Sequence, residues 1–283
     1  MKRFLLLLFP LLSGCLGEVS TDTEYHRQLV VEGRIEADGP AEVMLTENLP
    51  FQSTFTEQTL EDAVIRFAKV TVTADDGQSE ILTGYYDRNY PTRFAYRSAR
   101  LHGRAGGTYT LTVEYQGRVC TAVTTIPEPI PLQKLQPEPI CDSLFTLQAL
   151  FDDPAAKNAY LVECRTTDPG SYAPAVLGTV DDSVLDNGGS VKLTVNRPLY
   201  YLKIKDYKQY FRPNETIDVR FSHISSFTFD FWSRLENEML NAMNPVFPAY
   251  ENLPSNIEGD ARGIWSGYGS SYYRITMPRK TAP

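Results

Sequence analysis

The segment TYTLTVEYQGRVCTAVTT, residues 108–125, sets the fold class of this chain. In each half, bulky apolar residues alternate with threonines or charged residues, which is the two-residue period of a strand with one buried face. Between the halves lies Gln116-Gly117, which suits a tight turn because glycine accepts a positive φ at little cost. The segment therefore predicts an antiparallel β-hairpin.

Short strands also precede this hairpin. Period-two segments lie at 29–35, 41–45 and 68–73, and the turn formers Asp38-Gly39-Pro40 and Asp75-Asp76-Gly77 interrupt the chain between strands. Their polar outward positions favour antiparallel sheets, since buried parallel strands read as continuous apolar runs. We predict an N-terminal antiparallel β-sandwich, Ig-like in build, over residues 29–126.

Prolines dominate the next stretch of the chain. Five of them fall between Ile126 and Ile140, at positions 127, 129, 131, 137 and 139. Each proline fixes φ and removes a backbone donor that a β-ladder would need. The pattern predicts a stiff, extended linker over residues 127–140 between two domains.

The second domain, residues 141–283, also reads as β-rich, with one helix. A hairpin is predicted from 142–151 and 159–165, followed by strands at 190–195 and 200–204. Apolar residues at three- and four-residue spacing predict an amphipathic helix over about 226–244, with Ser225 or Ser226 as its cap and Pro245 ending it. The predicted fold class is mostly β, with two antiparallel β-sandwich domains, the second carrying one helix.

The N-terminus has the pattern of a secretory signal. Lys2-Arg3 precede an apolar run of about nine residues, against the ~20 needed to span a bilayer as a helix. The run ends in Leu12-Ser13-Gly14-Cys15, which resembles a bacterial lipobox, so we expect residues 1–14 to be removed and Cys15 to carry lipid. An ordinary secretory signal cleaved elsewhere is the alternative, because Pro10 interrupts the run. Residues 15–28 are expected to form a flexible tether.

Charge and composition narrow the function classes. The chain has 27 Lys and Arg against 35 Asp and Glu, a formal net charge of −8, which argues against a nucleic-acid partner. Its three histidines and four cysteines show no metal-ligand spacing, so we predict neither a metal site nor a cofactor.

Residues with catalytic potential lack a catalytic pattern. The serines near the C-terminus lack the Gly-x-Ser-x-Gly elbow, and His26, His102 and His223 have no neighbour that marks them as a base. The pairs Asp75-Asp76, Asp152-Asp153 and Asp181-Asp182 could serve a glycosidase, but adjacent acids in turns usually face water. The same loops could hold Ca²⁺, although their spacing is not that of an EF-hand. We expect a binding protein rather than an enzyme.

Aromatic residues concentrate between Gly263 and Arg274. Trp265, Tyr268, Tyr272 and Tyr273 lie among glycines and could stack on a ligand, which makes this segment the best candidate for a recognition surface. Packing inside a final strand that closes the second sandwich is the favoured interpretation, because Trp and Tyr suit strands and glycines suit bulges.

With Cys15 lipidated, three cysteines remain. Cys141 and Cys164 flank the same predicted hairpin and form the expected disulfide, which leaves Cys120 as a small buried apolar residue. Three free thiols are the alternative.

Four segments in chain order carry a family resemblance: LVVEGRI at 29–35, GTYTL at 107–111, IPEP at 126–129 and SNIEG at 255–259. Together with the lipobox, they resemble Bacteroidota outer-membrane lipoproteins of the domain-of-unknown-function 4249 family. The resemblance implies a lipid-anchored outer-membrane protein, often encoded near a TonB-dependent receptor, with no assigned catalytic residues.

The family resemblance alone favours an accessory lipoprotein of a TonB-dependent receptor that captures and hands over a ligand. A structural or adhesive cell-surface module is the alternative, and an envelope hydrolase is the less favoured one. The ligand, and the choice between the periplasmic and external faces of the outer membrane, stay open.

Overall fold

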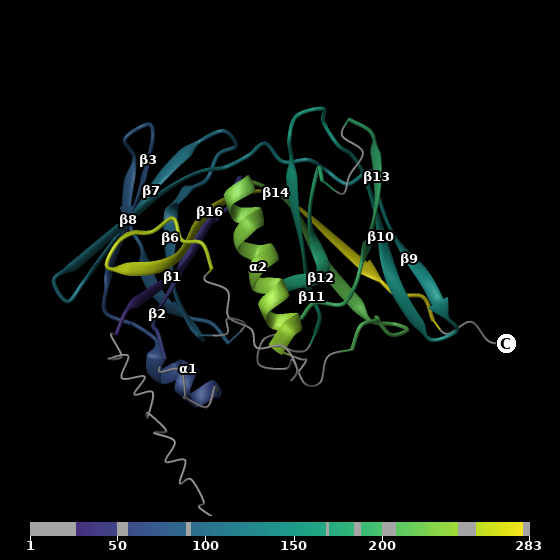
Figure 1. Ribbon diagram of the computed structural model, residues 1–283, viewed down its shortest axis with the longest axis horizontal. Helices are drawn as coiled ribbons and strands as arrows, with labels where there is room; N and C mark the ends of the chain where they lie inside the picture. The colour runs from purple at the N-terminus through teal and green to yellow at the C-terminus, as the bar shows by residue number, and fades with distance from the viewer. Residues whose placement is uncertain are drawn as a thin grey trace, which may run out of the picture.

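The computed structural model describes residues 27–49, 56–88, 92–167, 170–183, 188–199, 208–242 and 253–279. Figure 1 shows two groups of strands side by side, with the helix α2 (Ser226–Ala242) in front between them. The described chain is mostly β, and most of its strand pairs are antiparallel, so the predicted fold class is confirmed. We call the two groups the N-terminal lobe and the C-terminal lobe.

Two layers of strands form the N-terminal lobe. The first layer contains β1 (Leu29–Glu36), β2 (Pro40–Glu47), β6 (Phe94–His102) and β5 (Thr83–Tyr86). The second contains β15 (Glu258–Gly259), β8 (Arg118–Thr125), β7 (Thr108–Tyr115), β3 (Lys69–Ala74) and β4 (Ser79–Ile81). Alternate apolar residues of both layers meet in one core, which includes Val31, Ile35, Val43, Val72, Leu111 and Val113.

The hairpin predicted at residues 108–125 is present. Strand β7 pairs with β8 in antiparallel register, from Thr108 opposite Thr125 to Tyr115 opposite Arg118. Gln116 and Gly117 have φ values of 49° and 77°, so both turn residues are left-handed, as a two-residue type I′ turn requires.

The C-terminal lobe is a second sandwich. One layer contains β12 (Tyr172–Asp181), β11 (Ala159–Arg165), β14 (Thr216–Ile224) and part of β16 (Ala261–Thr276). The other contains β13 (Ser190–Val195), β10 (Leu144–Asp152) and β9 (Lys134–Cys141). Aromatic and aliphatic residues fill its core, among them Phe151, Tyr160, Val162, Phe211, Val219 and Phe221. The strand predicted at 200–204 lies outside the described residues.

The segment predicted as a stiff, extended linker, residues 127–140, forms a strand of the C-terminal lobe in its second half. Residues Lys134–Cys141 form β9, although they include Pro137 and Pro139. Among the described strands, β9 pairs with β10 alone, so it is an edge strand, where a proline does not interrupt a ladder on its outer side.

Strand β16 joins the two lobes. Its first half, from Ala261 to Tyr268, runs parallel to β1, and its second half, from Gly269 to Thr276, runs antiparallel to β14. The first layers of both lobes thereby form one eight-stranded sheet. The predicted boundary at residue 141 therefore misassigns β15 and the first half of β16, which complete the N-terminal lobe. The parallel pairing with β1 is also an exception to the predicted antiparallel order.

Glycines allow β16 to pass close to the chain that connects the lobes. A Cβ atom on Gly267 would lie 2.5 Å from the Thr125 carbonyl oxygen, and one on Gly269 would lie 2.4 Å from that of Pro127. Both positions therefore require glycine for the close approach of two backbones.

Two helices complete the described fold. Ser225 caps α2, since its Oγ accepts from the Thr228 N–H at 3.2 Å, and the helix lies within the predicted range. The short α1 (Glu57–Ala63), which was not predicted, begins with a capping box between Thr56 and Thr59. Neither helix in the described parts of the chain has the length and apolar character needed to span a bilayer.

Candidate functional site

Two of the four aromatic residues predicted as a recognition surface are core residues. Trp265 is fully buried in the core of the N-terminal lobe, and its Nε1 donates to the Tyr109 carbonyl oxygen at 3.0 Å. Tyr268 is also buried, and its hydroxyl accepts from Trp232 Nε1 of α2 at 3.0 Å. The ligand-binding hypothesis is therefore wrong for both, and the packing interpretation holds for them.

The other two aromatic residues lie on opposite faces of β16. Tyr273 packs against the C-terminal core, and its hydroxyl accepts from the Leu132 N–H at 2.6 Å. Tyr272 is 56% exposed, but its hydroxyl donates to the Glu36 carboxylate. The four predicted residues thus do not form one binding surface.

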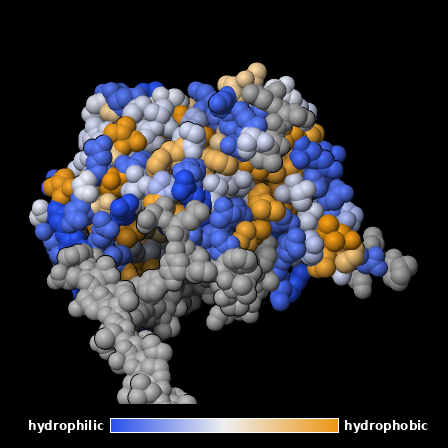
Figure 2. All heavy atoms as spheres, in the orientation of Figure 1, coloured by the Kyte–Doolittle hydropathy of each residue, from blue (hydrophilic) through white to orange (hydrophobic). Residues whose placement is uncertain are grey.

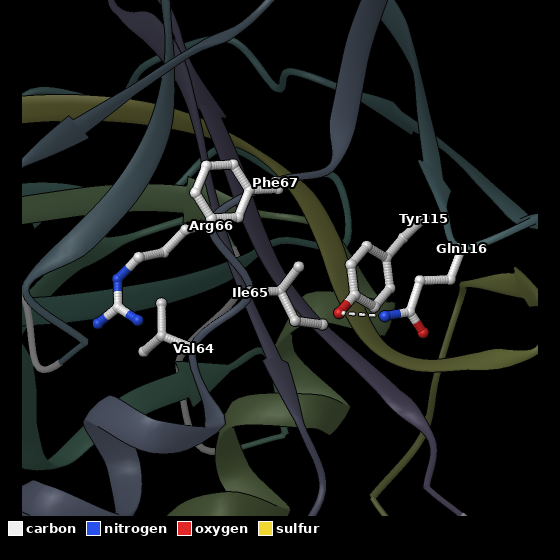
Figure 3. A pocket seen from close by; sticks show the side chains of 6 residues that line it. All are labelled: Val64, Ile65, Arg66, Phe67, Tyr115 and Gln116. Atoms are coloured by element: carbon white, nitrogen blue, oxygen red, sulfur yellow. Dashed lines mark hydrogen bonds between the residues drawn. The ribbon is translucent and has the colours of Figure 1, made fainter.

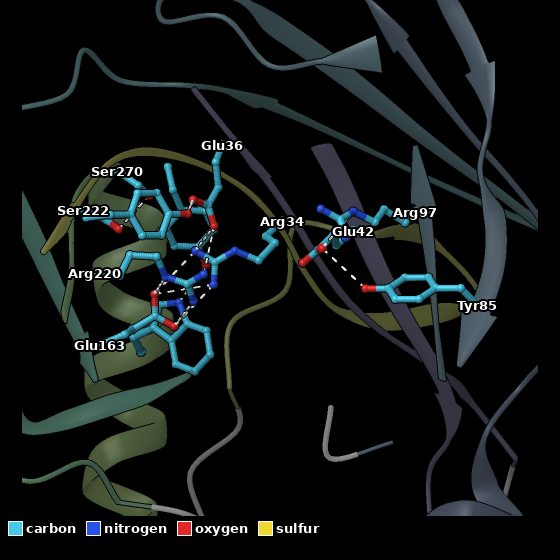
Figure 4. Close-up of polar contacts among 12 residues, drawn as sticks. Arg34, Glu36, Glu42, Tyr85, Arg97, Glu163, Arg220, Ser222 and Ser270 are labelled. Carbon is cyan, nitrogen blue, oxygen red and sulfur yellow. Dashed lines mark hydrogen bonds and ion pairs between the residues drawn. The ribbon is translucent and has the colours of Figure 1, made fainter. Parts of the chain in front are cut away.

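The most conspicuous polar feature is a cluster of four charged side chains, which we call the ionic junction: Arg34, Glu36, Glu163 and Arg220. They converge from β1, β11 and β14 where the lobes meet (Figure 4). Arg220 binds both oxygens of Glu163 at 2.6 and 2.7 Å and reaches Glu36 at 3.0 Å. Arg34 contacts Glu36 at 2.7 Å and Glu163 at 3.3 Å.

Aromatic rings cover the two guanidinium groups. The Arg34 guanidinium lies 4.3 Å from the centroid of the Tyr268 ring, and the Arg220 guanidinium lies 4.5 Å from that of Tyr172. These cation–π contacts strengthen when water is excluded. Glu163 is only 3% exposed, so the junction is a desolvated, hydrogen-bonded charge network.

The charges of the junction hold one another in their ionised states. Burial opposes the charged form of Glu163, but Arg220 and Arg34 outweigh it and lower its pKa to about 2. The same balance between burial and the two arginines lowers the pKa of Glu36. Burial raises the pKa of Tyr268 to about 12. The tyrosine hydroxyls at the junction therefore stay protonated at neutral pH.

The geometry gives the junction a structural role, which is to hold the two lobes together. Two positive and two negative groups balance, and each Glu163 oxygen already accepts from arginine. Breaking such a buried pair is costly, because it leaves a charge without compensation.

Sequence analysis missed these residues. The available signal was a charged residue inside an otherwise apolar strand, as with Glu163 in AYLVECR at 159–165.

A small cavity adjoins the junction between α2 and the sheet. Its lining includes Glu32, Arg34, Met44 and Trp232, and its volume of about 20 Å³ is enough for about one water molecule. This cavity is too small to bind an organic ligand.

A larger, open pocket lies at the end where the described chain begins (Figure 3). It has a volume of about 360 Å³, and its lining residues are Val64, Ile65, Arg66, Phe67, Tyr115 and Gln116. Phe67 is 94% exposed. Arg118, which follows the turn at this pocket, donates to the Arg27 carbonyl oxygen at 3.1 Å and so places the first described residue beside it.

The three acidic pairs have different surroundings. Asp75 lies at the surface, where it binds Arg104 at 2.5 Å and the Thr108 N–H at 3.0 Å. Asp153 and Asp182 are instead brought together by Asn158 in the C-terminal lobe. No group of three or more His, Cys, Asp or Glu side chains converges as a metal site in the described ranges.

The predicted disulfide between Cys141 and Cys164 does not form. Cys141 is exposed at the end of the edge strand β9, whereas Cys164 is fully buried in β11, and both are free. Burial raises the pKa of the Cys164 thiol well above its ordinary value, so this thiol is unreactive. Cys120 is buried on β8 as predicted. Cys15 lies outside the described residues.

Both histidines in the described ranges lie against backbone carbonyl oxygens. His102 Nδ1 lies 3.0 Å from the Arg100 carbonyl oxygen, and His223 Nδ1 lies 2.8 Å from that of Glu128. His26 lies outside the described residues.

Comparison with known proteins identifies the family of this chain. No curated protein matches the chain. Among solved structures, the chain is similar to the FN1–FN3 domains of chicken CNTN1, with 10% identity and a TM-score of 0.23, over 90% of this chain and 67% of that one. A family model described as a domain of unknown function, DUF4249, matches residues 17–271. Because that match spans most of the sequence, the chain belongs to the DUF4249 family.

Proposed function

We propose that this protein is a lipid-anchored accessory module of the outer membrane that binds a TonB-dependent receptor without covalent chemistry. The observation that carries the proposal is the rigid joint between the lobes. One sheet runs through both lobes, and the ionic junction is buried where they meet. Such a body presents a fixed surface to a partner, as a docking module does.

The open pocket supplies the contact surface in this proposal. Arg27 lies twelve residues after Cys15, so an extended tether reaches at most about 40 Å. A lipid on Cys15 would hold the pocket beside Arg27 close to the membrane, where a membrane-embedded receptor lies. Phe67 projects there as an exposed aromatic residue, the type that often dominates interface energies.

Purification from the native membrane tests this proposal. The affinity-tagged lipoprotein is isolated in mild detergent, and proteins that co-elute in stoichiometric amount are identified by mass spectrometry. We expect a TonB-dependent receptor in the eluate. No partner, with lipid on Cys15 verified by mass spectrometry, would sink the proposal.

Two variants locate the contact surface. Phe67→Ser should weaken receptor binding by about 2 kcal/mol or more, about thirtyfold in Kd. Ile140→Ser removes a half-exposed apolar residue from the C-terminal lobe and should leave binding unchanged. Equal losses in both variants would refute the placement at the pocket.

The outer face of the second layer of the N-terminal lobe favours a second candidate, a structural or adhesive surface module. The outward positions of β3, β7 and β8 carry short β-branched residues with little charge: Thr71, Thr73, Thr110, Thr112, Val119, Thr121 and Val123. On the face of the molecule that Figure 2 shows, polar and apolar residues are interspersed. This second function predicts that no receptor co-purifies.

A further inference from the structure

Two carboxylates of the C-terminal lobe bind the same asparagine. Asp153 directly follows β10, and Asp182 directly follows β12. Asn158 binds both, since its Nδ2 lies 3.4 Å from Asp153 Oδ1 and its backbone N–H donates to Asp182 Oδ2 at 2.9 Å. Two acids from separate loops therefore share one neighbour.

Each of these carboxylates keeps one buried oxygen without a donor. Asp153 Oδ2 and Asp182 Oδ1 are both shielded from solvent and accept no hydrogen bond. Asp153 as a whole is only 3% exposed. Within the described ranges, neither forms an ion pair with Lys or Arg. A buried carboxylate oxygen without a donor is costly, and a second carboxylate nearby adds repulsion, so either a bound cation or a proton would stabilise the site.

Packing fixes the orientation of Asp153. The Tyr160 hydroxyl donates to Asp153 Oδ1 at 2.5 Å, and the Asp153 backbone N–H donates to the Gly189 carbonyl oxygen at 2.9 Å. The Tyr160 ring is itself held against Phe151 and Phe221, at centroid distances of 4.8 and 5.3 Å. The Asp153 carboxylate is therefore held in one orientation, with Oδ2 free of hydrogen bonds.

Two backbone carbonyl oxygens of the same loop face the Asn158 side chain. The carbonyl oxygens of Pro154 and Ala156 lie 3.0 and 2.7 Å from Asn158 Nδ2. We infer that the loop at 153–158, together with Asp182, is a Ca²⁺ site in which Asp153 Oδ2 and Asp182 Oδ1 are the carboxylate ligands. Loop carbonyls and water complete the coordination.

Calcium fits this oxygen set better than magnesium does. Ca²⁺ accepts six to eight oxygens in flexible geometry, whereas Mg²⁺ demands near-octahedral coordination and retains its waters. With only two carboxylates, the site belongs with the weaker extracellular calcium modules, whose Kd values are about 10⁻⁴–10⁻³ M. This inference does not depend on the proposed receptor.

The test measures Ca²⁺ binding by the full chain in detergent. Isothermal titration calorimetry with CaCl₂ should give one saturable site, and the melting temperature should rise by about 5 °C or more when Ca²⁺ exceeds its Kd a hundredfold. EDTA should reverse the rise, and MgCl₂ at the same concentration should give a smaller one. The absence of both binding heat and a melting shift would overturn the inference.

Two asparagine variants show whether the named ligands bind the ion. Asp182→Asn, at a half-buried position, should abolish the calcium-dependent shift, whereas Asp142→Asn, at an exposed acid of the same lobe, should retain it. An equal shift in both variants would mean that Ca²⁺ binds the acidic surface at large, which overturns the inference. If the two carboxylates instead share a proton, Asp182→Asn should be more stable than the natural chain, and Ca²⁺ should change the stability of neither protein. This result would also overturn the inference.

Discussion

At the residue scale, Glu163 is the side chain on which the joint between the lobes most depends. It accepts from Arg220 of its own lobe and from Arg34 of β1 in the other lobe. The Arg34 and Glu163 positions are separated by 129 residues in sequence. One carboxylate thus connects elements that have no local reason to meet.

Removing the charge of Glu163 should strongly destabilise the protein. Glu163→Gln keeps the side-chain volume but leaves two buried guanidinium groups with one carboxylate, which should cost about 3–5 kcal/mol. Urea unfolding followed by circular dichroism measures the loss. Glu114→Gln, which breaks a surface pair with Lys69 at 2.6 Å, is the control and should cost less than about 1 kcal/mol. Similar losses in both variants would show that the junction does not stabilise the fold.

Stability should fall in acid because of the same residue. Folding lowers the pKa of Glu163 from 4.5 to about 2, so the folded state favours the ionised carboxylate. Its contribution is fully present above about pH 5 and is lost as the pH falls from there towards about 2. Urea midpoints measured across this range should decline, and the decline should be smaller in Glu163→Gln. Parallel curves for the two proteins would contradict the assignment.

At the scale of elements, β16 does the most to organise the fold. Its sixteen residues pair with β1 in one lobe and with β14 in the other. Its glycines permit the close crossing with the interlobe connection, and its aromatic residues fill both cores. The alternation of glycine and aromatic residues in this segment is therefore a packing pattern.

A side chain at the crossing should destabilise the fold. Gly269→Ala places a Cβ 2.4 Å from the Pro127 carbonyl oxygen, so backbone must move, at a cost of about 1–3 kcal/mol. Thermal unfolding should show the loss. Ser271→Ala, two residues further along the same strand, should change stability by no more than about 0.5 kcal/mol. A neutral Gly269→Ala variant would mean that the crossing is not tight.

At the scale of the whole molecule, the two lobes should unfold together. The shared sheet and the buried junction couple them, so calorimetry should show one transition whose calorimetric and van't Hoff enthalpies agree. Two separate transitions would contradict this coupling. They would also weaken the proposed docking function, which rests on a rigid body.

Local patterns determined much of this fold. The alternation in residues 108–125 and the Gln116-Gly117 turn predicted the central hairpin, because both strands and the turn lie in one short segment. The helix α2 was predictable for a similar reason, since its period and its cap at Ser225 are local. Pro137 and Pro139 led to the prediction of a linker where the chain forms β9. A proline is compatible with a strand when that strand lies at the edge of a sheet, and this position cannot be read from the local sequence.

The sequence by itself therefore determined many of the strands, the main helix and the antiparallel sandwich class, because these follow from periodicity over a few residues. Only the tertiary structure decided that β16 belongs to both lobes, that Trp265 and Tyr268 are core residues, and that four charges form a buried junction. The partners of these residues are far away in the chain, as with Tyr272 and Glu36, which are 236 positions apart. Burial and charge pairing at such separations arise only when the sheets assemble, so no local pattern reports them.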